Sequence, residues 1–204
     1  MNAGTMYAAT ADKYAAGMLQ EMDKSLYGKR FSRLLSNSRE GTVIDVGCGS
    51  GDCLALMQKL TPGARLRFLG VDPCPEMLAI AKKRAPEARF LLQGAEELLP
   101  PEADVRAILC YFVIHHLSEA TFAAVLAHWH QILAPGGRIL IGFWHGKQGE
   151  KMEYPGQWAS LVAQYYSHEQ VEDLCREAGF TIDYSEQEED KDMGMCMGFV
   201  QASK

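Results

Sequence analysis

The sequence has no surplus of positive charge: 20 lysines and arginines stand against 26 aspartates and glutamates, for a formal net charge of -6. A protein that holds a long polyanion usually carries a basic surplus, because neutralised phosphates supply most of its affinity. Nucleic acid is therefore not an expected partner. The two basic clusters, at 29–33 and 82–84, are interpreted as solvated helix faces.

Long hydrophobic runs are also missing. The longest nearly uninterrupted apolar run covers residues 107–114, which is far too short to cross a bilayer. Residues 1–14 contain no basic segment followed by an apolar stretch, so no signal peptide is predicted. These features favour a cytoplasmic protein that does not enter a membrane.

The sequence lacks paired cysteines and paired metal ligands as well. Its six cysteines are scattered, with no C-x-x-C pair, and no two histidines have the spacing of metal ligands. Most of the cysteines fall in apolar runs, where a free thiol behaves as a small hydrophobic side chain. We therefore predict neither disulfides nor a metal site. The sequence carries no signal for an oligomeric state.

The 204 residues, 48% of them hydrophobic, are enough for one large domain with a sizeable core. After a helical N-terminal part, segments typical of strands alternate with segments typical of helices. Strands are expected at 42–46, 66–71, 89–92, 107–114, 138–143, 181–184 and 198–202, with an acidic loop at 186–192. This alternation predicts an α/β fold: a doubly wound sheet with five parallel strands and two C-terminal strands, the last antiparallel.

Residues 43–51, with the sequence Val-Ile-Asp-Val-Gly-Cys-Gly-Ser-Gly, form the most informative segment. A buried strand runs into three glycines at alternate positions and then into a helix, so a ligand can approach the backbone and its free N–H groups. The second strand ends at Asp72, 21 residues after Gly51, where nucleotide-binding folds place an acid that accepts from ribose hydroxyls. The alternative interpretation is a tight turn with a helix-capping aspartate.

The spacing of the glycines separates two kinds of nucleotide cofactor. A dinucleotide fingerprint needs its third glycine at position 52, where this sequence has Asp52. Asp45 also puts a charge into the first strand, where dinucleotide sites usually have an apolar residue. A nicotinamide-dependent oxidoreductase is therefore the disfavoured alternative within this fold.

The segment 43–51 resembles the first motif of class I S-adenosylmethionine-dependent methyltransferases of the small-molecule type. The resemblance continues to residue 143 and, more loosely, to Ala178-Gly179-Phe180. It implies a Rossmann-like seven-stranded sheet with an antiparallel last strand, and S-adenosylmethionine as the cofactor. It also implies transfer of a methyl group to an O, N, S or C nucleophile of a small-molecule acceptor. A non-catalytic, methyltransferase-like binding subunit is the alternative from another functional class.

The same resemblance implies which residues surround the cofactor, from its methionine part through the ribose to the adenine. They are Asp45, Gly47, Cys48, Gly49, Gly51, Asp72, Pro73, Met77, Gly94, Ala95 and Glu96. Gly94 departs from the family, whose members often have an aspartate there that accepts from the adenine amino group. Either the Ala95 N–H or the Glu96 side chain replaces that contact, or the contact is lost.

Beyond the cofactor ring, the resemblance implies that Cys110 faces the sulfonium, with His115 and His116 at the end of the same strand. A neutral histidine at this place is a candidate general base. The alternative is a histidine that hydrogen-bonds the backbone beside Ser118, at the start of the next helix. His115 is assigned to the cofactor site, and no catalytic residue is assigned.

The acceptor is expected to meet the segments that the cofactor leaves free. Tyr7 and Tyr14 share one face of an N-terminal helix, and Trp144 and His145 begin an aromatic-rich segment, 144–166, after the cofactor-binding core at 42–143. We expect the helical cover at 1–40 and the lid at 144–166 to enclose the acceptor. The alternative is that these aromatic side chains only anchor the helix and the loop.

Overall fold

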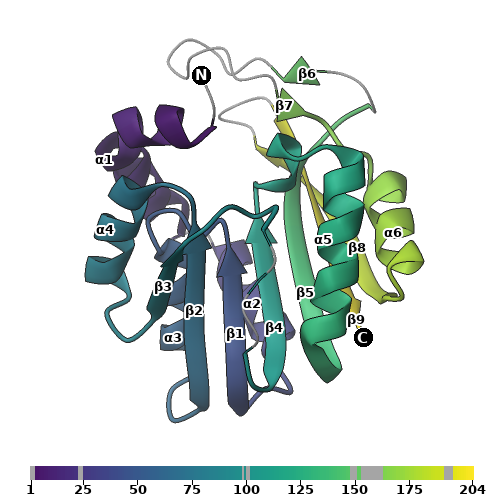
Figure 1. Ribbon diagram of the computed structural model, residues 1–204, viewed down its shortest axis with the longest axis horizontal. Coiled ribbons are helices and arrows are strands. Elements are labelled where there is room, and N and C mark those ends of the chain that lie inside the picture. Colours follow the sequence, from purple (N-terminus) through teal and green to yellow (C-terminus); the bar gives the residue numbers. More distant parts are fainter. Residues whose placement is uncertain are drawn as a thin grey trace.

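The computed structural model describes residues 3–22, 25–97, 99, 102–147, 151–152, 163–190 and 195–204. Among these residues, a seven-stranded sheet with the order β3-β2-β1-β4-β5-β9-β8 forms the centre of the molecule (Figure 1). Its strands are β1 (Glu40–Val46), β2 (Arg65–Asp72), β3 (Arg89–Leu92), β4 (Val105–Tyr111), β5 (Leu133–His145), β8 (Thr181–Asp190) and β9 (Met195–Ser203). A separate antiparallel pair consists of β6 (Lys151–Met152) and β7 (Ala163–Gln164).

The strand directions confirm the predicted doubly wound α/β sheet. Strands β1 to β5 pair in parallel, whereas β9 is antiparallel to both of its neighbours, β5 and β8. The chain winds from β1 outward to β3 and then crosses back to β4 and β5. In open α/β sheets, the crevice where the order reverses, at the carboxyl ends of the strands, is the usual ligand site.

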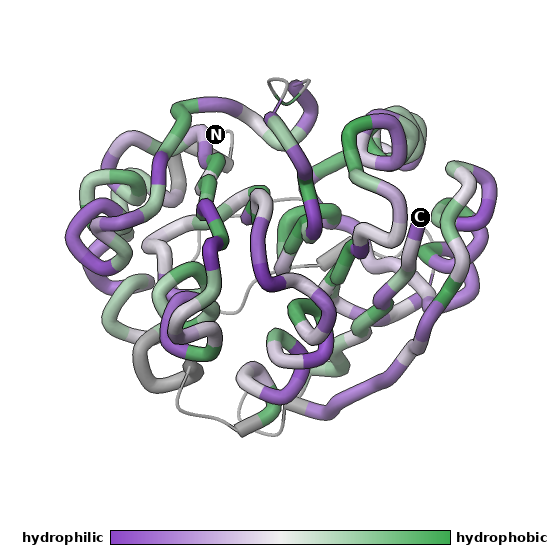
Figure 2. The backbone as a smooth tube through the Cα atoms, turned by 90° about the horizontal axis from the view of Figure 1, so that it is seen from below, coloured by the Kyte–Doolittle hydropathy of each residue, from purple (hydrophilic) through white to green (hydrophobic). Residues whose placement is uncertain are grey.

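Helices cover both faces of the sheet (Figures 1 and 2). They are α1 (Ala3–Met22), α2 (Ser25–Leu34), α3 (Asp52–Leu60), α4 (Pro75–Arg84), α5 (Glu119–Ile132) and α6 (His168–Glu177). Helices α5 and α6 pack on one face, α2 and α3 pack on the other, and α1 lies against α4. None of the helices that the structure describes combines the length and the apolar character that a bilayer crossing requires.

The inner strands are buried on both faces, which explains their nearly continuous apolar sequences. In β1, Val43 belongs to the core beneath α2 and α3, whereas Ile44 and Val46 belong to the core beneath α5 and α6. Asp45 interrupts this pattern with a charge that is only 2% exposed. A buried carboxylate at the carboxyl end of a central strand is costly unless it serves a site.

The helix ends agree with the local signals in the sequence. Ser118 accepts a hydrogen bond from the Thr121 N–H at 3.1 Å at the start of α5, and Ser167 accepts one from the Gln170 N–H at 3.1 Å at the start of α6. Gly179, with a φ of +97°, takes the left-handed conformation after α6. These local interactions fix where both helices begin and where α6 ends.

Two predicted strand ends are wrong at the carboxyl edge of the sheet. The strand expected at 107–114 ends at Tyr111, because Phe112 has a left-handed backbone with a φ of +55° and Ile114–His116 form a 3-10 turn, η1. The strand expected to end at 143 continues through Trp144 and His145. Buried apolar runs do not distinguish a strand from a short buried turn, since both require the same residue types.

The acidic segment 186–192 was expected to be a loop, but its residues 186–190 belong to strand β8. Residues 191 and 192 lie outside the described residues. Glu186 and Glu188 of β8 pair with Arg30 of α2 at 2.5 and 2.9 Å. Arg30 is 4% exposed, and its guanidinium lies 3.5 Å from the centre of the Phe199 ring. Interpreting the cluster at 29–33 as a solvated face is therefore wrong for Arg30.

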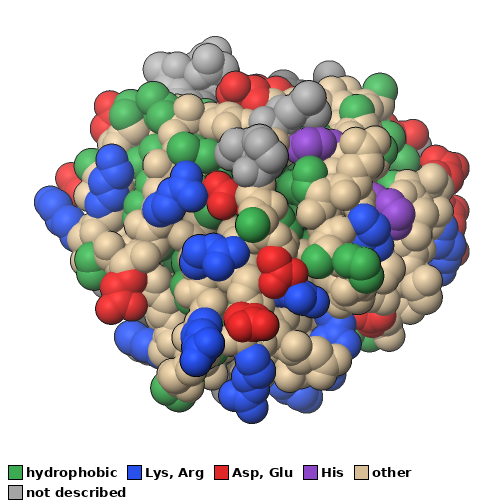
Figure 3. All heavy atoms as spheres, turned by 60° about the horizontal axis from the view of Figure 1, so that its bottom comes forward, with side chains coloured by type: hydrophobic (Ala, Val, Ile, Leu, Met, Phe, Trp, Pro, Cys, Tyr) green, Lys and Arg blue, Asp and Glu red, His purple; other side chains and the backbone are tan. Residues whose placement is uncertain are grey.

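The face where the parallel strands begin carries charges of both signs. Figure 3 shows Lys and Arg side chains spread over it among Asp and Glu. At the start of β3, Arg89 pairs with Glu102 at 3.0 Å, and at the start of β4, Arg106 pairs with Asp104 at 2.7 Å. Exposed pairs of this kind contribute little to stability.

Candidate functional site

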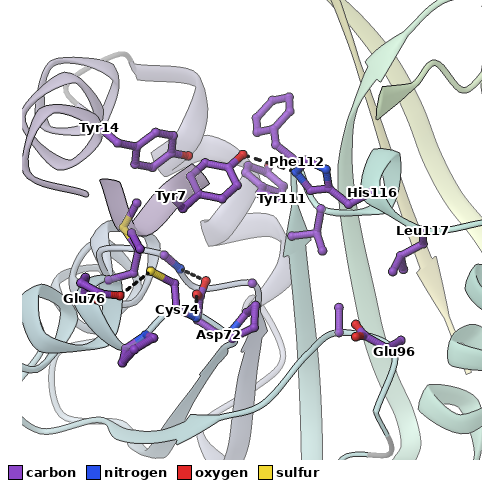
Figure 4. A pocket seen from close by; sticks show the side chains of 18 of the residues that line it. Tyr7, Tyr14, Asp72, Cys74, Glu76, Glu96, Tyr111, Phe112, His116 and Leu117 are labelled. Atoms are coloured by element: carbon purple, nitrogen blue, oxygen red, sulfur yellow. Dashed lines mark hydrogen bonds between the residues drawn. The ribbon is translucent and has the colours of Figure 1, made fainter. Parts of the chain in front are cut away.

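A cavity of about 770 Å³ opens at the carboxyl ends of the parallel strands (Figure 4). One side, here called the β1/β2 wall, consists of Gly47, Gly49, Asp72, Pro73 and Met77. The opposite side, here called the α1/β4 wall, consists of Tyr7, Tyr14, Phe112, Val113 and His116. The cavity therefore lies where the sheet topology places a ligand site.

The turn after β1 needs glycine for two different reasons. Gly47 and Gly51 have φ values of +71° and +80°, and an added Cβ would collide with neighbouring atoms, which at Gly47 belong to Val113. Gly49 has a φ of +49°, and the atom nearest to an added Cβ would be Tyr14 Cε1 at 3.9 Å. Gly47 and Gly51 thus permit close packing of the turn, whereas Gly49 leaves open space beside the cavity.

Asp72 ends β2 and is 8% exposed. Its Oδ2 accepts a hydrogen bond from the Gly49 N–H at 2.9 Å, and its Oδ1 accepts one from the Cys74 N–H at 2.8 Å. Burial raises the pKa of the Asp72 carboxyl, and the two N–H groups act against that rise. Each carboxylate oxygen has a further lone pair, so Asp72 can also accept from hydroxyl groups of a ligand.

Asp45 is the more deeply buried of the two carboxylates. Its Oδ2 has no hydrogen-bond partner among the described residues. Burial raises the pKa of its carboxyl well above the usual range, and the nearby Asp72 and Asp52 raise it further. Asp45 and Cys48 line a small hollow beside the main cavity. A cationic group of a ligand in this hollow would supply the missing hydrogen bond and the missing counter-charge.

The turn after β3 borders another part of the cavity. Ala95 and Glu96 line it, whereas Gly94 is not in the lining formed by the described residues. The Gly94 N–H donates to Glu97 Oε1 at 2.7 Å, and a Cβ at Gly94 would lie 2.6 Å from the Glu96 carboxylate. The Glu96 side chain thus occupies the space that a larger residue at position 94 would need.

Cys110 and His115 are predicted site residues that the structure places in the core. Each is 1% exposed. Burial raises the pKa of the Cys110 thiol and lowers the pKa of the His115 ring, so both side chains are held neutral. Neither belongs to the lining that the described residues give the cavity. Their contact with a cofactor stays a prediction.

Trp144 and His145 lie beside the cavity rather than in it. Trp144 packs against Phe112, a lining residue, with ring centroids 4.8 Å apart. His145 Nδ1 lies 3.2 Å from His168 Nδ1, and its Nε2 lies 3.1 Å from Gln187 Nε2. Most of the predicted lid, residues 148–150 and 153–162, lies outside the described residues, so its contact with a substrate stays a prediction.

Phe112 and Val113 of the α1/β4 wall were not identified from the sequence. No sequence pattern signals the left-handed backbone of Phe112, which brings this aromatic residue into the lining. The pair His115-His116 is conspicuous in the sequence, but only the structure shows that His116 lines the cavity. Its Nε2 lies 3.4 Å from the Tyr7 hydroxyl (Figure 4).

Comparison with known proteins adds independent support. Residues 43–137 match the family described as "Methyltransferase domain". The demethylmenaquinone methyltransferase of Chlorobaculum tepidum is 34% identical over 113 residues, which are 55% of this chain and 45% of that protein. That of Thermus thermophilus is 31% identical over 103 residues, which are 48% of this chain and 45% of that protein. This chain therefore spans a little under half the length of these curated relatives.

Solved structures show the same fold. The 1,6-didemethyltoxoflavin-N1-methyltransferase of Burkholderia thailandensis, with 1,6-didemethyltoxoflavin and S-adenosylhomocysteine bound, matches with a TM-score of 0.71 at 24% identity. The match covers 100% of this chain and 91% of that one. An S-adenosylmethionine-dependent methyltransferase of Mesorhizobium loti matches with a TM-score of 0.71 at 17% identity, over 90% of this chain and 100% of that one.

The sheet order and the glycine turn define the class of fold: this chain has the fold of the class I S-adenosylmethionine-dependent methyltransferases, and its residues 43–137 match the methyltransferase-domain family. The predicted fold is thereby confirmed, and the similarity over residues 43–137 supports the predicted family and cofactor. The residues of the site also fit S-adenosylmethionine. Asp45 Oδ2, which has no partner among the described residues, suits its ammonium group, Asp72 has lone pairs for its ribose hydroxyls, and Gly49 leaves open space beside the cavity.

Proposed function

We propose that this chain transfers the methyl group of S-adenosylmethionine to a small-molecule acceptor held against the α1/β4 wall. The observation that carries the proposal is the pair of buried carboxylates, Asp45 and Asp72, near the carboxyl ends of the neighbouring strands β1 and β2. One carboxylate lacks a hydrogen-bond partner among the described residues, and the other borders the cavity. Such groups match the two polar ends of the non-adenine part of the cofactor.

The residues in and beside the β1/β2 wall then have distinct tasks. Asp45 accepts from the ammonium group, and Asp72 accepts from the ribose hydroxyls. Met77 and Ala95, both buried and both in the lining, offer apolar contact to the adenine ring. In place of the acid that relatives often carry at position 94, Glu96 supplies a carboxylate beside that ring.

The sulfonium of the cofactor makes its methyl group electrophilic, so the difficult chemistry comes with the cofactor. The chain has to hold the nucleophile in line with the methyl group, at about 3 Å, and to keep water away. The α1/β4 wall supplies that enclosure: Tyr7 and Tyr14 pack edge to face with ring centroids 5.5 Å apart, and Phe112 and Val113 continue the apolar surface.

The acceptor that suits this wall is a neutral molecule with an apolar ring. The lining that the described residues form contains no lysine or arginine, and it includes the carboxylates of Asp72, Glu76 and Glu96. An anionic acceptor would meet these carboxylates without a counter-charge. The acceptors in the names of two similar proteins, demethylmenaquinone and 1,6-didemethyltoxoflavin, are the first compounds to assay.

Calorimetry tests the cofactor half of the proposal. S-adenosylmethionine and S-adenosylhomocysteine are expected to release heat on titration into the protein, and NADH is not. Heat with NADH alone would contradict the proposal. Heat with none of the three would instead favour a non-catalytic binding subunit.

A methyl-transfer assay tests the acceptor half. Labelled methyl groups from S-adenosylmethionine are expected to appear on a neutral ring compound in the panel, and not when Asp72→Ala replaces the parent protein. Transfer only to carboxylates, with neutral compounds inert, would contradict the proposed acceptor class while leaving the cofactor assignment intact.

A further inference from the structure

His116 is the only imidazole in the cavity lining that the described residues form. It ends η1, the 3-10 turn after β4, and Figure 4 shows its ring directed toward Tyr7, on the other side of the cavity from Asp72. Phe112, Val113 and Leu117, its neighbours in the chain, are also in the lining. The ring nitrogen of His116 is thus a polar group within an otherwise apolar stretch of the wall.

A phenolic hydroxyl already lies next to this nitrogen. Tyr7 Oη is 3.4 Å from His116 Nε2, and the two rings meet edge to face with centroids 6.0 Å apart. This distance is at the long end of the hydrogen-bond range, so the contact uses the nitrogen weakly. A donor that is better placed in the cavity can replace the Tyr7 hydroxyl.

The environment keeps His116 neutral and fixes its orientation. Burial lowers the pKa of its ring to about 4, so near neutral pH one ring nitrogen carries a lone pair. In the tautomer with the proton on Nδ1, that lone pair is on Nε2, and the Tyr7 hydroxyl donates to it. The ring also packs on that of His115, with centroids 4.0 Å apart, and His115 is 1% exposed.

From this geometry we infer that His116 binds the reacting group of the methyl acceptor: its Nε2 accepts a hydrogen bond from the O–H or N–H that is methylated, at the place of the Tyr7 hydroxyl. The inference rests on the proposed function and adds the class of substrate. The acceptor is a neutral molecule whose nucleophile carries a proton, such as a phenol, an enol or a ring N–H.

This arrangement also gives the proton a destination. The nucleophile forms a bond to the methyl carbon, the carbon–sulfur bond breaks with its electron pair left on sulfur, and the proton of the nucleophile passes to His116 Nε2. A methylated oxygen that still carries its proton is a strong acid, so even a ring of low basicity can accept that proton. His116 therefore acts both in orienting the acceptor and in the reaction.

Two fluorinated probes of nearly equal shape test the inference without knowledge of the natural acceptor. In fluorine NMR with S-adenosylhomocysteine present, the parent protein is expected to bind para-fluorophenol about fivefold more tightly than para-fluoroanisole, the effect of one neutral hydrogen bond. His116→Leu is expected to bring this ratio to about one. His128→Leu, on α5 and outside the described lining, is the matched control and should keep the parent ratio.

A second variant tests the same site with His116 in place. Tyr7→Phe removes the competing hydroxyl and is expected to raise the affinity for para-fluorophenol, whereas an unchanged or lower affinity overturns the inference. The inference is also overturned if the parent protein binds the two probes equally, or if His116→Leu keeps the preference for para-fluorophenol. Calorimetric titration of S-adenosylhomocysteine into the same samples tests the proposed function separately. If S-adenosylhomocysteine does not bind, the affinities for the two probes are compared in its absence.

Discussion

The β1/β2 wall of the cavity is made of glycines, backbone N–H groups and carboxylates that follow one another closely in the sequence. The α1/β4 wall is made of side chains from distant segments, and Tyr7 and His116, which touch across it, are 109 residues apart. The first wall presents groups that suit one cofactor, whereas the second has to suit one acceptor. The difference teaches that cofactor binding depends on a local backbone motif, and acceptor choice on tertiary packing.

The two walls meet at Gly47, whose missing side chain leaves room for Val113. Gly47→Ala is expected to have the largest effect of any single change considered, because the added Cβ would overlap Val113 and the residue has a φ of +71°. We expect a loss of roughly 2–4 kcal/mol of unfolding free energy, measured by urea denaturation, together with loss of S-adenosylhomocysteine binding.

Gly63 offers a matched control for this change. It has a φ of +75°, but nothing lies within 4 Å of an added Cβ. Gly63→Ala should therefore cost only the backbone strain, about 1 kcal/mol. Equal losses in the two variants would show that the contact between the walls contributes nothing.

Asp72→Ala removes a carboxylate from the β1/β2 wall and leaves the residues of the α1/β4 wall unchanged. The variant loses the acceptor for ribose hydroxyls and the support of the Gly49 and Cys74 N–H groups. We expect S-adenosylhomocysteine to bind roughly 10- to 100-fold more weakly in calorimetry, with Asp72→Asn between the variant and the parent. Parent-like affinity in Asp72→Ala would mean that the ribose does not lie at the end of β2.

The contrast between the walls also explains what the sequence could predict. Asp45, Gly47, Gly49 and Asp72 belong to local patterns, a strand end, a turn and a helix start, whose geometry depends on nearby residues. The backbone of Phe112 depends instead on packing between distant segments. A single sequence carries no record of that packing.

The C-terminal edge of the sheet shows the same limit in another form. Glutamates have low strand propensity, so the acidic segment after residue 185 looks like a loop. In the structure, Arg30 from α2 lies against Glu186 and Glu188 and supplies their counter-charge. The segment pairs with β9 along its length, and a helix far away in the sequence balances its charge. Local propensity indicates neither contact.

His116 of the α1/β4 wall and Asp45 in the hollow beside the β1/β2 wall are expected to respond to acid in opposite directions. Burial lowers the pKa of His116 from 6.5 to about 4, so between these values the unfolded chain binds more protons and stability is lost as the pH falls. Burial raises the pKa of Asp45, so the folded chain binds more protons and this residue adds stability as the pH falls through its raised pKa.

Single variants separate these contributions in urea denaturation near pH 7 and about pH 4.5. His116→Gln should lose less stability than the parent between the two conditions, by roughly 2 kcal/mol. Asp45→Asn should lose more than the parent, because it lacks the opposing contribution. If both variants changed in the same direction, the charge states assigned to His116 and Asp45 would be wrong.

The smallest expected effect concerns the backbone of α1. S-adenosylhomocysteine should slow amide hydrogen exchange strongly at 47–51, where N–H groups border the ligand, and only modestly in residues 7–18. The ligand would cover the turn itself, whereas the helix contributes only the Tyr7 and Tyr14 side chains to the cavity. Exchange in α6, on the other side of the sheet from α3, is the internal control and should not change. Protection at 47–51 with none in residues 7–18 or 144–166 would mean that neither the helical cover nor the predicted lid closes over the cofactor.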